Sequence, residues 1–212
     1  MIEVDHHINA VRRTVGDRTL EEGEVRVITI SRSYPTGAED LWDACTNAER
    51  LPRWFAPVSG DLRLGGTFSI EGNAGGTILT CEPPTSFTAT WECAGMNPSW
   101  IELTIIAEGE EQSRFELSHI VPIDDHWEQF GPGAVGVGWD LAVLGLAMYL
   151  CSGQAVDREF SATFHLSNDG RAYISRSSEA WREAGVVGGA DPAWSTLAAD
   201  RTAAAFSGEV GS

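Results

Sequence analysis

Basic residues are few in this sequence, and lysine is absent altogether. All 14 basic residues are arginine, against 31 aspartates and glutamates, so the formal net charge is −17. The arginines are scattered along the chain and form no cluster. A chain this acidic repels the phosphate backbone of a nucleic acid, and we therefore expect no nucleic-acid partner.

The sequence also lacks a long uninterrupted apolar run. Residues 1–23 have neither the positive start nor the apolar segment of a signal peptide. The most apolar stretch, residues 134–151, is shorter than the roughly 20 residues that a spanning helix needs. It also contains Asp140 and three glycines. We expect a buried core helix there, no membrane insertion and a cytoplasmic location.

Cysteine is scarce, and its spacing matches no metal or redox motif. The four cysteines are Cys45, Cys81, Cys93 and Cys151, and no two of them form a Cys-x-x-Cys pair. We expect reduced, mostly buried thiols. The histidines have no accompanying acidic or cysteine spacing that would bind a metal ion. A P-loop and a Gly-x-Ser-x-Gly elbow are also missing, so we expect no metal and no cofactor.

Short strands are the main signal in the first two thirds of the chain. Residues 24–34 predict a strand with apolar residues toward both faces, and residues 11–20 predict a further short strand. From residue 58 to 121, strand-like runs alternate with turns, which is typical of an antiparallel meander. The runs are 59–64, 67–71, 77–81, 86–93, 100–107 and 113–121.

Helical spacing appears before and after this meander. The predicted helices cover 38–45, 47–55, the apolar stretch around 139–150, 169–184 and 191–206. Asn47 is a candidate N-cap for the second helix, Ser167 or Asn168 for the fourth, and Asp191-Pro192 opens the fifth. The last two helices carry regular apolar positions, so we expect them to pack on the core or on a second copy of the chain. These positions are Tyr173, Ala180, Trp181, Ala184, Trp194, Leu197 and Phe206.

A curved antiparallel sheet that grips the long apolar helix accounts for this order of elements, which places the protein in the α+β class. The predicted organisation is an N-terminal extension over 1–23, a main domain over 24–153 and a helical C-terminal extension over 154–212. The C-terminal helices offer a surface for a homodimer.

The apolar face of the sheet and the long helix would enclose a core or a cavity. The residues predicted to line it are Phe68, Ile70, Trp91, Phe115, Leu117, His119, Trp139, Val143 and Leu146. His119 lies among apolar neighbours and needs a hydrogen-bond partner, which is either a protein group or a ligand oxygen. Of the nearest acids, we expect Glu92 on the outer face of its strand and Asp140 on the solvent side of its helix. We assign no catalytic residue.

The run Tyr34–Phe55 resembles the start of bacterial proteins named for the activator of the heat-shock protein 90 ATPase. Those proteins belong to the START-like, birch-pollen-allergen-like superfamily (SRPBCC). The resemblance continues over about residues 24–153, and it implies a helix-grip fold and a cavity for hydrophobic small molecules. The other matching segments are Gly60–Phe68, Gly76-Thr77-Ile78, Glu82-Pro83-Pro84, Thr90-Trp91-Glu92 and Gly138-Trp139.

Three functions fit these observations. The first is a non-catalytic protein that binds a small hydrophobic, aromatic or lipid ligand in the cavity. The second, implied by the superfamily, is a cyclase-, aromatase- or hydrolase-like enzyme that uses the same cavity, with His119 as the residue to examine. The third is an interaction module for a chaperone partner, as the family name suggests.

Overall fold

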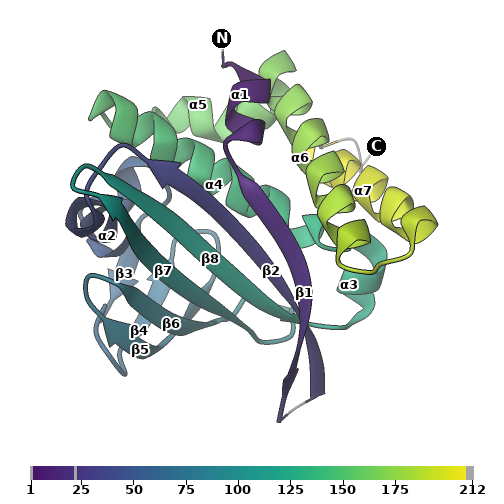
Figure 1. Cartoon of the computed structure of the whole chain (residues 1–212), viewed down its shortest axis with the longest axis horizontal. Helices are drawn as coiled ribbons and strands as arrows, with labels where there is room; N and C mark the ends of the chain where they lie inside the picture. Colours follow the sequence, from purple (N-terminus) through teal and green to yellow (C-terminus); the bar gives the residue numbers. More distant parts are fainter. Residues whose placement is uncertain (1, 22, 209–212) are drawn as a thin grey trace. The chain divides into compact units, whose positions relative to one another are not determined.

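Strands and helices follow the predicted order of elements (Figure 1). The computed structural model describes residues 2–21 and 23–208. In chain order the elements are α1 (Val4–Asn9), β1 (Arg12–Leu20), β2 (Gly23–Tyr34), α2 (Ala38–Thr46), the 3-10 turn η1 (Leu51–Arg53), β3 (Val58–Gly60), β4 (Thr67–Ile70), β5 (Gly75–Glu82), β6 (Ser86–Trp91), β7 (Ser99–Gly109), β8 (Gln112–Pro122), α3 (Asp125–Phe130), α4 (Gly133–Ser152), α5 (Arg158–Thr163), η2 (Phe164–Leu166), α6 (Asn168–Val187) and α7 (Pro192–Phe206).

The strands form one sheet in the order β1-β2-β8-β7-β6-β5-β4-β3. From β3 to β8, each strand pairs with the next in the chain in antiparallel fashion, so the predicted meander is confirmed. Strands β5 and β6 approach closely at Gly76, where a Cβ atom would collide with the carbonyl oxygen of Thr90. Only glycine fits there without a shift of the backbone. The α+β class is confirmed.

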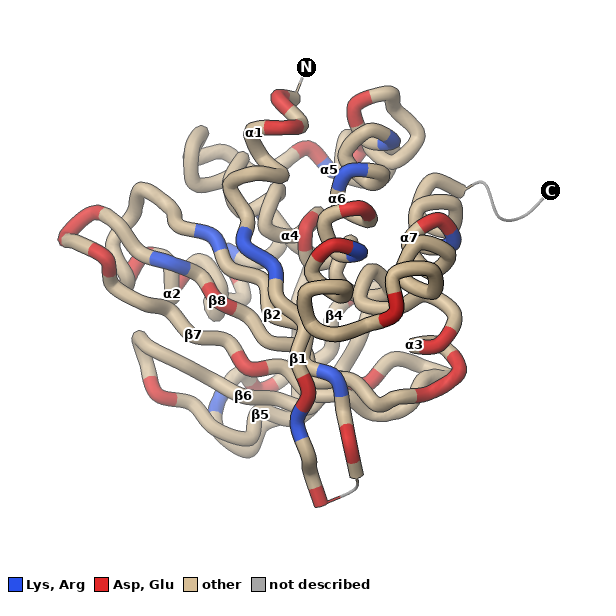
Figure 2. The backbone as a smooth tube through the Cα atoms, turned by 45° about the vertical axis from the view of Figure 1, so that its right-hand side comes forward, with Lys and Arg blue, Asp and Glu red and all other residues tan. Residues whose placement is uncertain are grey.

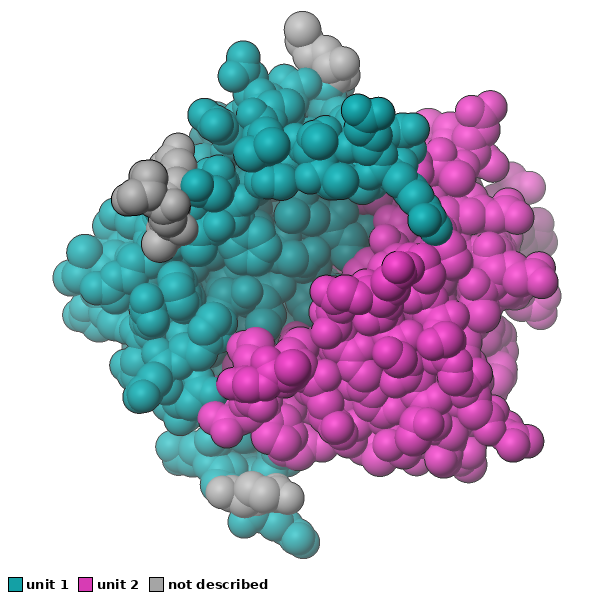
Figure 3. All heavy atoms as spheres, turned by 180° about the vertical axis from the view of Figure 1, so that it is seen from behind, with its two compact units in different colours: residues 1–30, 123–144, 157–212 teal, residues 31–122, 145–156 magenta. Residues whose placement is uncertain are grey.

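Two compact units divide the chain (Figure 3). Unit 1 comprises residues 1–30, 123–144 and 157–212, and unit 2 comprises residues 31–122 and 145–156. Strand β2 and helix α4 contribute residues to both units. The predicted division into an N-terminal extension, a main domain and a C-terminal extension uses other boundaries and stays a prediction.

Several short elements differ from the prediction. The helix expected over 47–55 is only the three-residue turn η1. Before it, Asn47 Oδ1 accepts from Glu49 N at 2.8 Å. The strand expected over 59–64 shrinks to Val58–Gly60. Helices α1, α3 and α5 were not predicted, since their six residues are too few to reveal a helical period.

The acid on the long helix is buried, so the expectation that it faces solvent is wrong. Asp140 has no exposed surface. Its carboxylate accepts two hydrogen bonds from Arg13 of β1, at 2.9 Å from Nε and 2.7 Å from Nη2. Ser177 Oγ and Trp181 Nε1 of α6 donate to the same carboxylate, at 2.5 and 2.8 Å. The buried charge is therefore paired and fully hydrogen-bonded.

The hydrogen bonds of Asp140 explain how a helix with so apolar a sequence packs within the protein. Among the described residues, α4 is the one helix long and apolar enough to cross a membrane, with a mean hydropathy of 1.7. An acid paired with Arg13 lies near its middle, and half of its apolar window is buried inside the protein. These contacts support the predicted core helix.

The C-terminal helices pack on the rest of unit 1. Tyr173 and Trp181 of α6 are fully buried, and the hydroxyl of Tyr173 donates to the carbonyl oxygen of Asp140 at 2.9 Å. Helix α7 packs on α6 and α3. Leu197, predicted to be buried, is instead 55% exposed, because α7 turns its small residues Ser195, Ala198 and Thr202 inward. The predicted caps are present: Ser167 accepts from Gly170 N, and Asp191 accepts from Trp194 N.

A glycine pair on α4 allows the packing against Trp181 to be tested. A Cβ atom at Gly136 would collide with the indole of Trp181, whereas one at Gly138 would meet nothing within 4 Å. We expect Gly136→Ala to lower the free energy of unfolding by about 1–3 kcal/mol through overpacking. Gly138→Ala should raise it by about 0.5–1 kcal/mol, because alanine is the better helix former. Urea unfolding measures both; equal effects of the two variants would contradict the packing.

The buried ion pair makes a second stability prediction. Asp140→Leu should lower the free energy of unfolding by about 3–5 kcal/mol, because the charge of Arg13 would be left buried and unpaired. Adding Arg13→Met should recover part of this loss, since the double variant has no unpaired charge. Additive losses in the double-mutant cycle would show that the two side chains do not interact.

Candidate functional site

The inner face of unit 2 is built by alternate residues of three adjacent strands. On β8, Phe115, Leu117 and His119 are buried, and they lie directly opposite Ile105, Leu103 and Ile101 of β7. On β6, Ala89 and Trp91 lie opposite Ile101 and Ser99. Because side chains alternate across a strand, these residues share one face. The predicted inward positions on β6 and β8 are therefore correct, while their role in ligand binding stays a prediction.

Aromatic rings continue this face toward β4. The ring centroids of Phe68 and Trp91 lie 6.3 Å apart, and those of Trp91 and His119 lie 6.0 Å apart in an edge-on arrangement. Ile70 of β4 is also buried, whereas Phe68 is only half-buried. Three rings from β4, β6 and β8 thus form a continuous aromatic row, in a geometry that aromatic side chains favour.

His119 has a protein partner that the sequence did not reveal. Ser99 Oγ lies 2.9 Å from His119 Nε2 and donates to the carbonyl oxygen of Trp91, also at 2.9 Å. Ser99 Oγ therefore lies within hydrogen-bond distance of both His119 Nε2 and the carbonyl oxygen of Trp91. Burial lowers the pKa of His119 to about 4 and keeps the ring neutral. The predicted strand began at residue 100, so Ser99, the first residue of β7, lay outside it and gave no signal.

Helix α2 covers the opposite end of this face. It packs against β7 and β8, and the ring of Trp42 lies edge-on to Phe87 of β6 at 6.2 Å. Ser113 of β8 donates to the carbonyl oxygen of Thr36, just before α2, at 2.7 Å. The inner face therefore runs from the end beneath α2, near Phe87, to the aromatic row at Phe68 and Trp91.

Arg50 ties α2 to the second half of α4. Its Nε donates to Tyr149 Oη at 2.9 Å, and its Nη1 donates to Asp40 and Asp43 at 2.8 and 2.9 Å. Burial lowers the pKa of Arg50, but these hydrogen bonds outweigh it and hold the pKa above its ordinary value. The same segment contacts α4 at Gly145, where a Cβ atom would lie 2.5 Å from the carbonyl oxygen of Trp54.

The predicted lining residues of α4 fall in different units. Leu146 belongs to unit 2 and is fully buried. Trp139 and Val143 belong to unit 1, where Val143 is fully buried and Trp139 half-buried. That they face the strands of unit 2 stays a prediction. Glu92 is exposed beyond the end of β6, as expected.

The described residues contain no group of three or more His, Cys, Asp or Glu side chains that could hold a metal ion. The four cysteines are free thiols, but only Cys45 is buried, so the expectation of mostly buried thiols is wrong. Burial raises the pKa of the Cys45 thiol. Cys151 is exposed, since it lies in the last turn of α4.

One glycine pattern resembles a dinucleotide-binding motif but lies in the wrong structural context. Residues 131–136 match Gly-x-Gly-x-x-Gly, which binds a dinucleotide only where it follows a strand. Here it follows α3. Its glycines serve helix packing, because a Cβ atom at Gly133 would press on Thr202 and one at Gly136 on Trp181.

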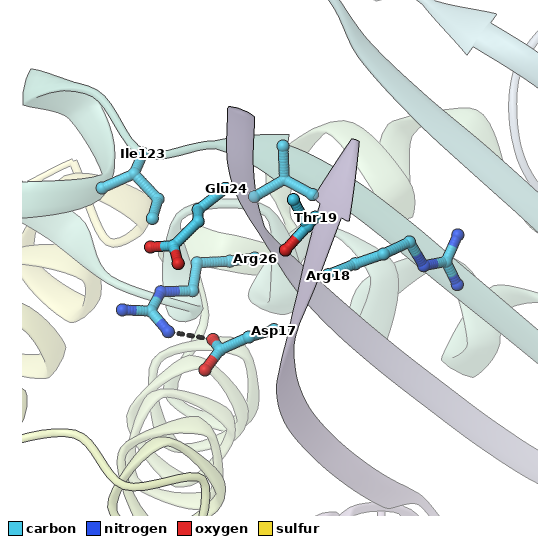
Figure 4. Close-up of a pocket in the computed structure, with 7 residues that line it drawn as sticks. Asp17, Arg18, Thr19, Glu24, Arg26 and Ile123 are labelled. Carbon is cyan, nitrogen blue, oxygen red and sulfur yellow. Dashed lines mark hydrogen bonds and ion pairs between the residues drawn. The ribbon is translucent and has the colours of Figure 1, made fainter. Parts of the chain in front are cut away.

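A small hollow near the turn end of the β1–β2 hairpin is shown in Figure 4. Its volume is about 130 Å³, and Arg26, Asp17 and Ile123 are among its lining residues. Arg26 pairs with Asp17 and lies over the ring of Trp127, 5.9 Å from the centroid. Typical ligand pockets measure about 300–1,000 Å³, so this hollow is too small for one.

An antiparallel meander with one apolar face and a long apolar helix defines a START-like protein. The model of the family described as "Activator of Hsp90 ATPase homolog 1-like protein" matches residues 35–150. The chain belongs to this family. No match is found among curated proteins.

Solved structures agree with this assignment. The crystal structure of CalU16 from Micromonospora echinospora is 33% identical, with a TM-score of 0.67, and the match covers 85% of this chain and 99% of CalU16. An HSP90 activator from Plasmodium falciparum is 22% identical, with a TM-score of 0.51, over 60% of this chain and 96% of that one. DynU16, from the dynemicin biosynthetic locus, is 20% identical, with a TM-score of 0.55, over 61% and 48%. The last two show the fold alone, and the helix-grip class is confirmed.

The buried His119 predicts a pH dependence of stability. Its pKa is about 4 in the folded protein, against 6.5 for the free side chain. The unfolded chain therefore binds more protons between these values, and the free energy of unfolding falls as pH drops from about 6.5 to about 4. Between pH 7 and pH 5, wild type should lose about 2 kcal/mol more than His119→Gln. Urea unfolding at the two pH values tests this, and equal losses would contradict it.

Proposed function

We propose that the chain binds a small hydrophobic ligand against the inner face of unit 2, with Leu146 of α4 among the contacts. The observation that carries this proposal is the aromatic row of Phe68, Trp91 and His119, which continues the aliphatic surface of β7 and β8. Apolar surfaces with a few placed polar groups are typical of small-molecule sites. Membership of a START-like family supports the same reading.

Binding without turnover fits the polar groups better than catalysis does. A general base that works near neutral pH needs a pKa close to that pH. The pKa of His119 is about 4, and its Nε2 is already hydrogen-bonded to Ser99. Glu92 is exposed and directly follows Trp91, the last residue of β6. The cyclase- or hydrolase-like alternative would therefore need a general base other than His119.

A chaperone-directed role rests on the family description and on the likeness to an HSP90 activator. Exposed large apolar residues of unit 2, such as Leu64, Leu79 and Met96, do not decide for it, since single exposed apolar residues are common. A cytoplasmic location and a homodimer through α6 and α7 are likewise proposals.

A larger side chain that fills the site proposed for unit 2 should prevent ligand binding there. Leu117→Trp enlarges a buried side chain at the centre of the inner face, and Glu116→Trp places the same ring one residue away on the opposite face. We expect Nile red, an uncharged solvatochromic dye, to bind wild type saturably. Leu117→Trp should weaken this at least tenfold, whereas Glu116→Trp should not.

Thermal melts of the same proteins separate a cavity from a packed core. If Leu117→Trp unfolds several degrees earlier and still binds the dye as wild type does, position 117 is packed and the site is misplaced. If wild type binds neither Nile red nor any ligand that co-purifies with it, the binding proposal fails and the interaction module becomes the better explanation.

A further inference from the structure

A groove of about 630 Å³ lies on the surface of unit 1, between α1, β1 and α6. Figure 1 shows these three elements side by side, and α6 packs on both of the others. The volume is within the range of small-molecule sites. Among the lining residues, Ile8 lies on α1, Val11 lies just before β1 and Val15 lies on β1. The side chains of Ala180, Ala184 and Val187 come from α6.

Contacts at both ends hold the groove open between them. At one end, α6 rests on the strand, since a Cβ atom at Gly188 would lie 2.5 Å from the carbonyl oxygen of Val15. At the other end, Arg176 of α6 pairs with Asp5 of α1 at 3.4 Å. Between these contacts, the lining residues of α6 include the short side chains of Ala180 and Ala184, with Glu179 and Glu183 beside them. The space therefore lies between a close backbone approach at Gly188 and an exposed ion pair, beside two short side chains of α6.

The charges that face the groove are mostly acidic. Arg13 lines its floor, but its side chain is 6% exposed and its charge is bound to Asp140. The other charged lining residues are Asp5, Arg176, Glu179 and Glu183, which are three carboxylates against one guanidinium. Acidic positions on α1 and α6 are visible in Figure 2.

Glu183 is the carboxylate with the weakest partner. Glu179 accepts two hydrogen bonds from Arg182, at 2.8 and 2.6 Å, which lower its pKa. Glu183 lies 3.9 Å from Arg182, and its side chain is 67% exposed. With a net charge of −17 on the chain, the surrounding potential also attracts cations.

We propose that this groove binds a small amphipathic organic cation, such as an alkylamine. Its apolar body lies against Ile8, Val11 and Ala184, and its ammonium group pairs with Glu183. The site is independent of the ligand proposed for unit 2. Its elements also lie outside residues 35–150, the part of the chain that the family model matches.

Calorimetric titration of the full chain with n-octylammonium tests the proposal, with n-octanol as the uncharged probe of the same length. Wild type should bind the amine more tightly than the alcohol. Glu183→Gln should weaken amine binding about threefold to fivefold, as expected for one exposed ion pair, and leave alcohol binding unchanged. Glu159→Gln, an exposed glutamate on α5, removes the same charge elsewhere and should change neither.

Filling the groove supplies the second test. Ala184→Phe should abolish binding of both probes, whereas Ala172→Phe, at an exposed position of α6 that does not line the groove, should not. Equal affinity for the two probes, or binding that Ala184→Phe leaves intact, would overturn the proposal. Loss of amine binding in Leu117→Trp alone would place the amine in unit 2, which supports the function proposed there and overturns this one.

Discussion

A single buried negative charge organises unit 1. Asp140 lies inside the most apolar helix of the chain, where an isolated carboxylate would be strongly unfavourable. Arg13, Ser177 and Trp181 all donate to it, so the hydrogen bonds that compensate for its burial come from β1 and α6 together. The segments before and after the family domain are therefore bound to its core by an electrostatic requirement, in addition to apolar contact.

Unit 2 shows the opposite arrangement, in which apolar burial dominates and polar groups are few. Its inner face holds His119, whose ring burial keeps neutral and whose Nε2 lies within hydrogen-bond distance of Ser99 Oγ. A neutral, fully oriented imidazole beside Trp91 adds polarity without adding charge. The inner face of unit 2 is therefore mostly apolar and aromatic, with an uncharged histidine among its polar groups.

The sequence predicted best what depends on neighbouring residues. Alternation placed Phe115, Leu117 and His119 on one face, and local capping signals placed the starts of α6 and α7 at Ser167 and Asp191. Prediction from the sequence failed where the hydrogen-bond partner of a residue lies far along the chain. The partner of Asp140 is 127 residues away and the partner of His119 is 20 residues away. Leu197 failed for a related reason, because α7 packs through small residues whose apolar signal is weak.

The contact between Gly136 and Trp181 has a consequence for how this protein can change. The indole occupies the volume that any side chain at position 136 would need, and its Nε1 is also a donor to Asp140. A larger residue at 136 is acceptable only together with a smaller one at 181, and that exchange removes a donor from a buried carboxylate. Positions 136, 140 and 181 should therefore evolve as one linked set, and substitutions among relatives should appear there jointly.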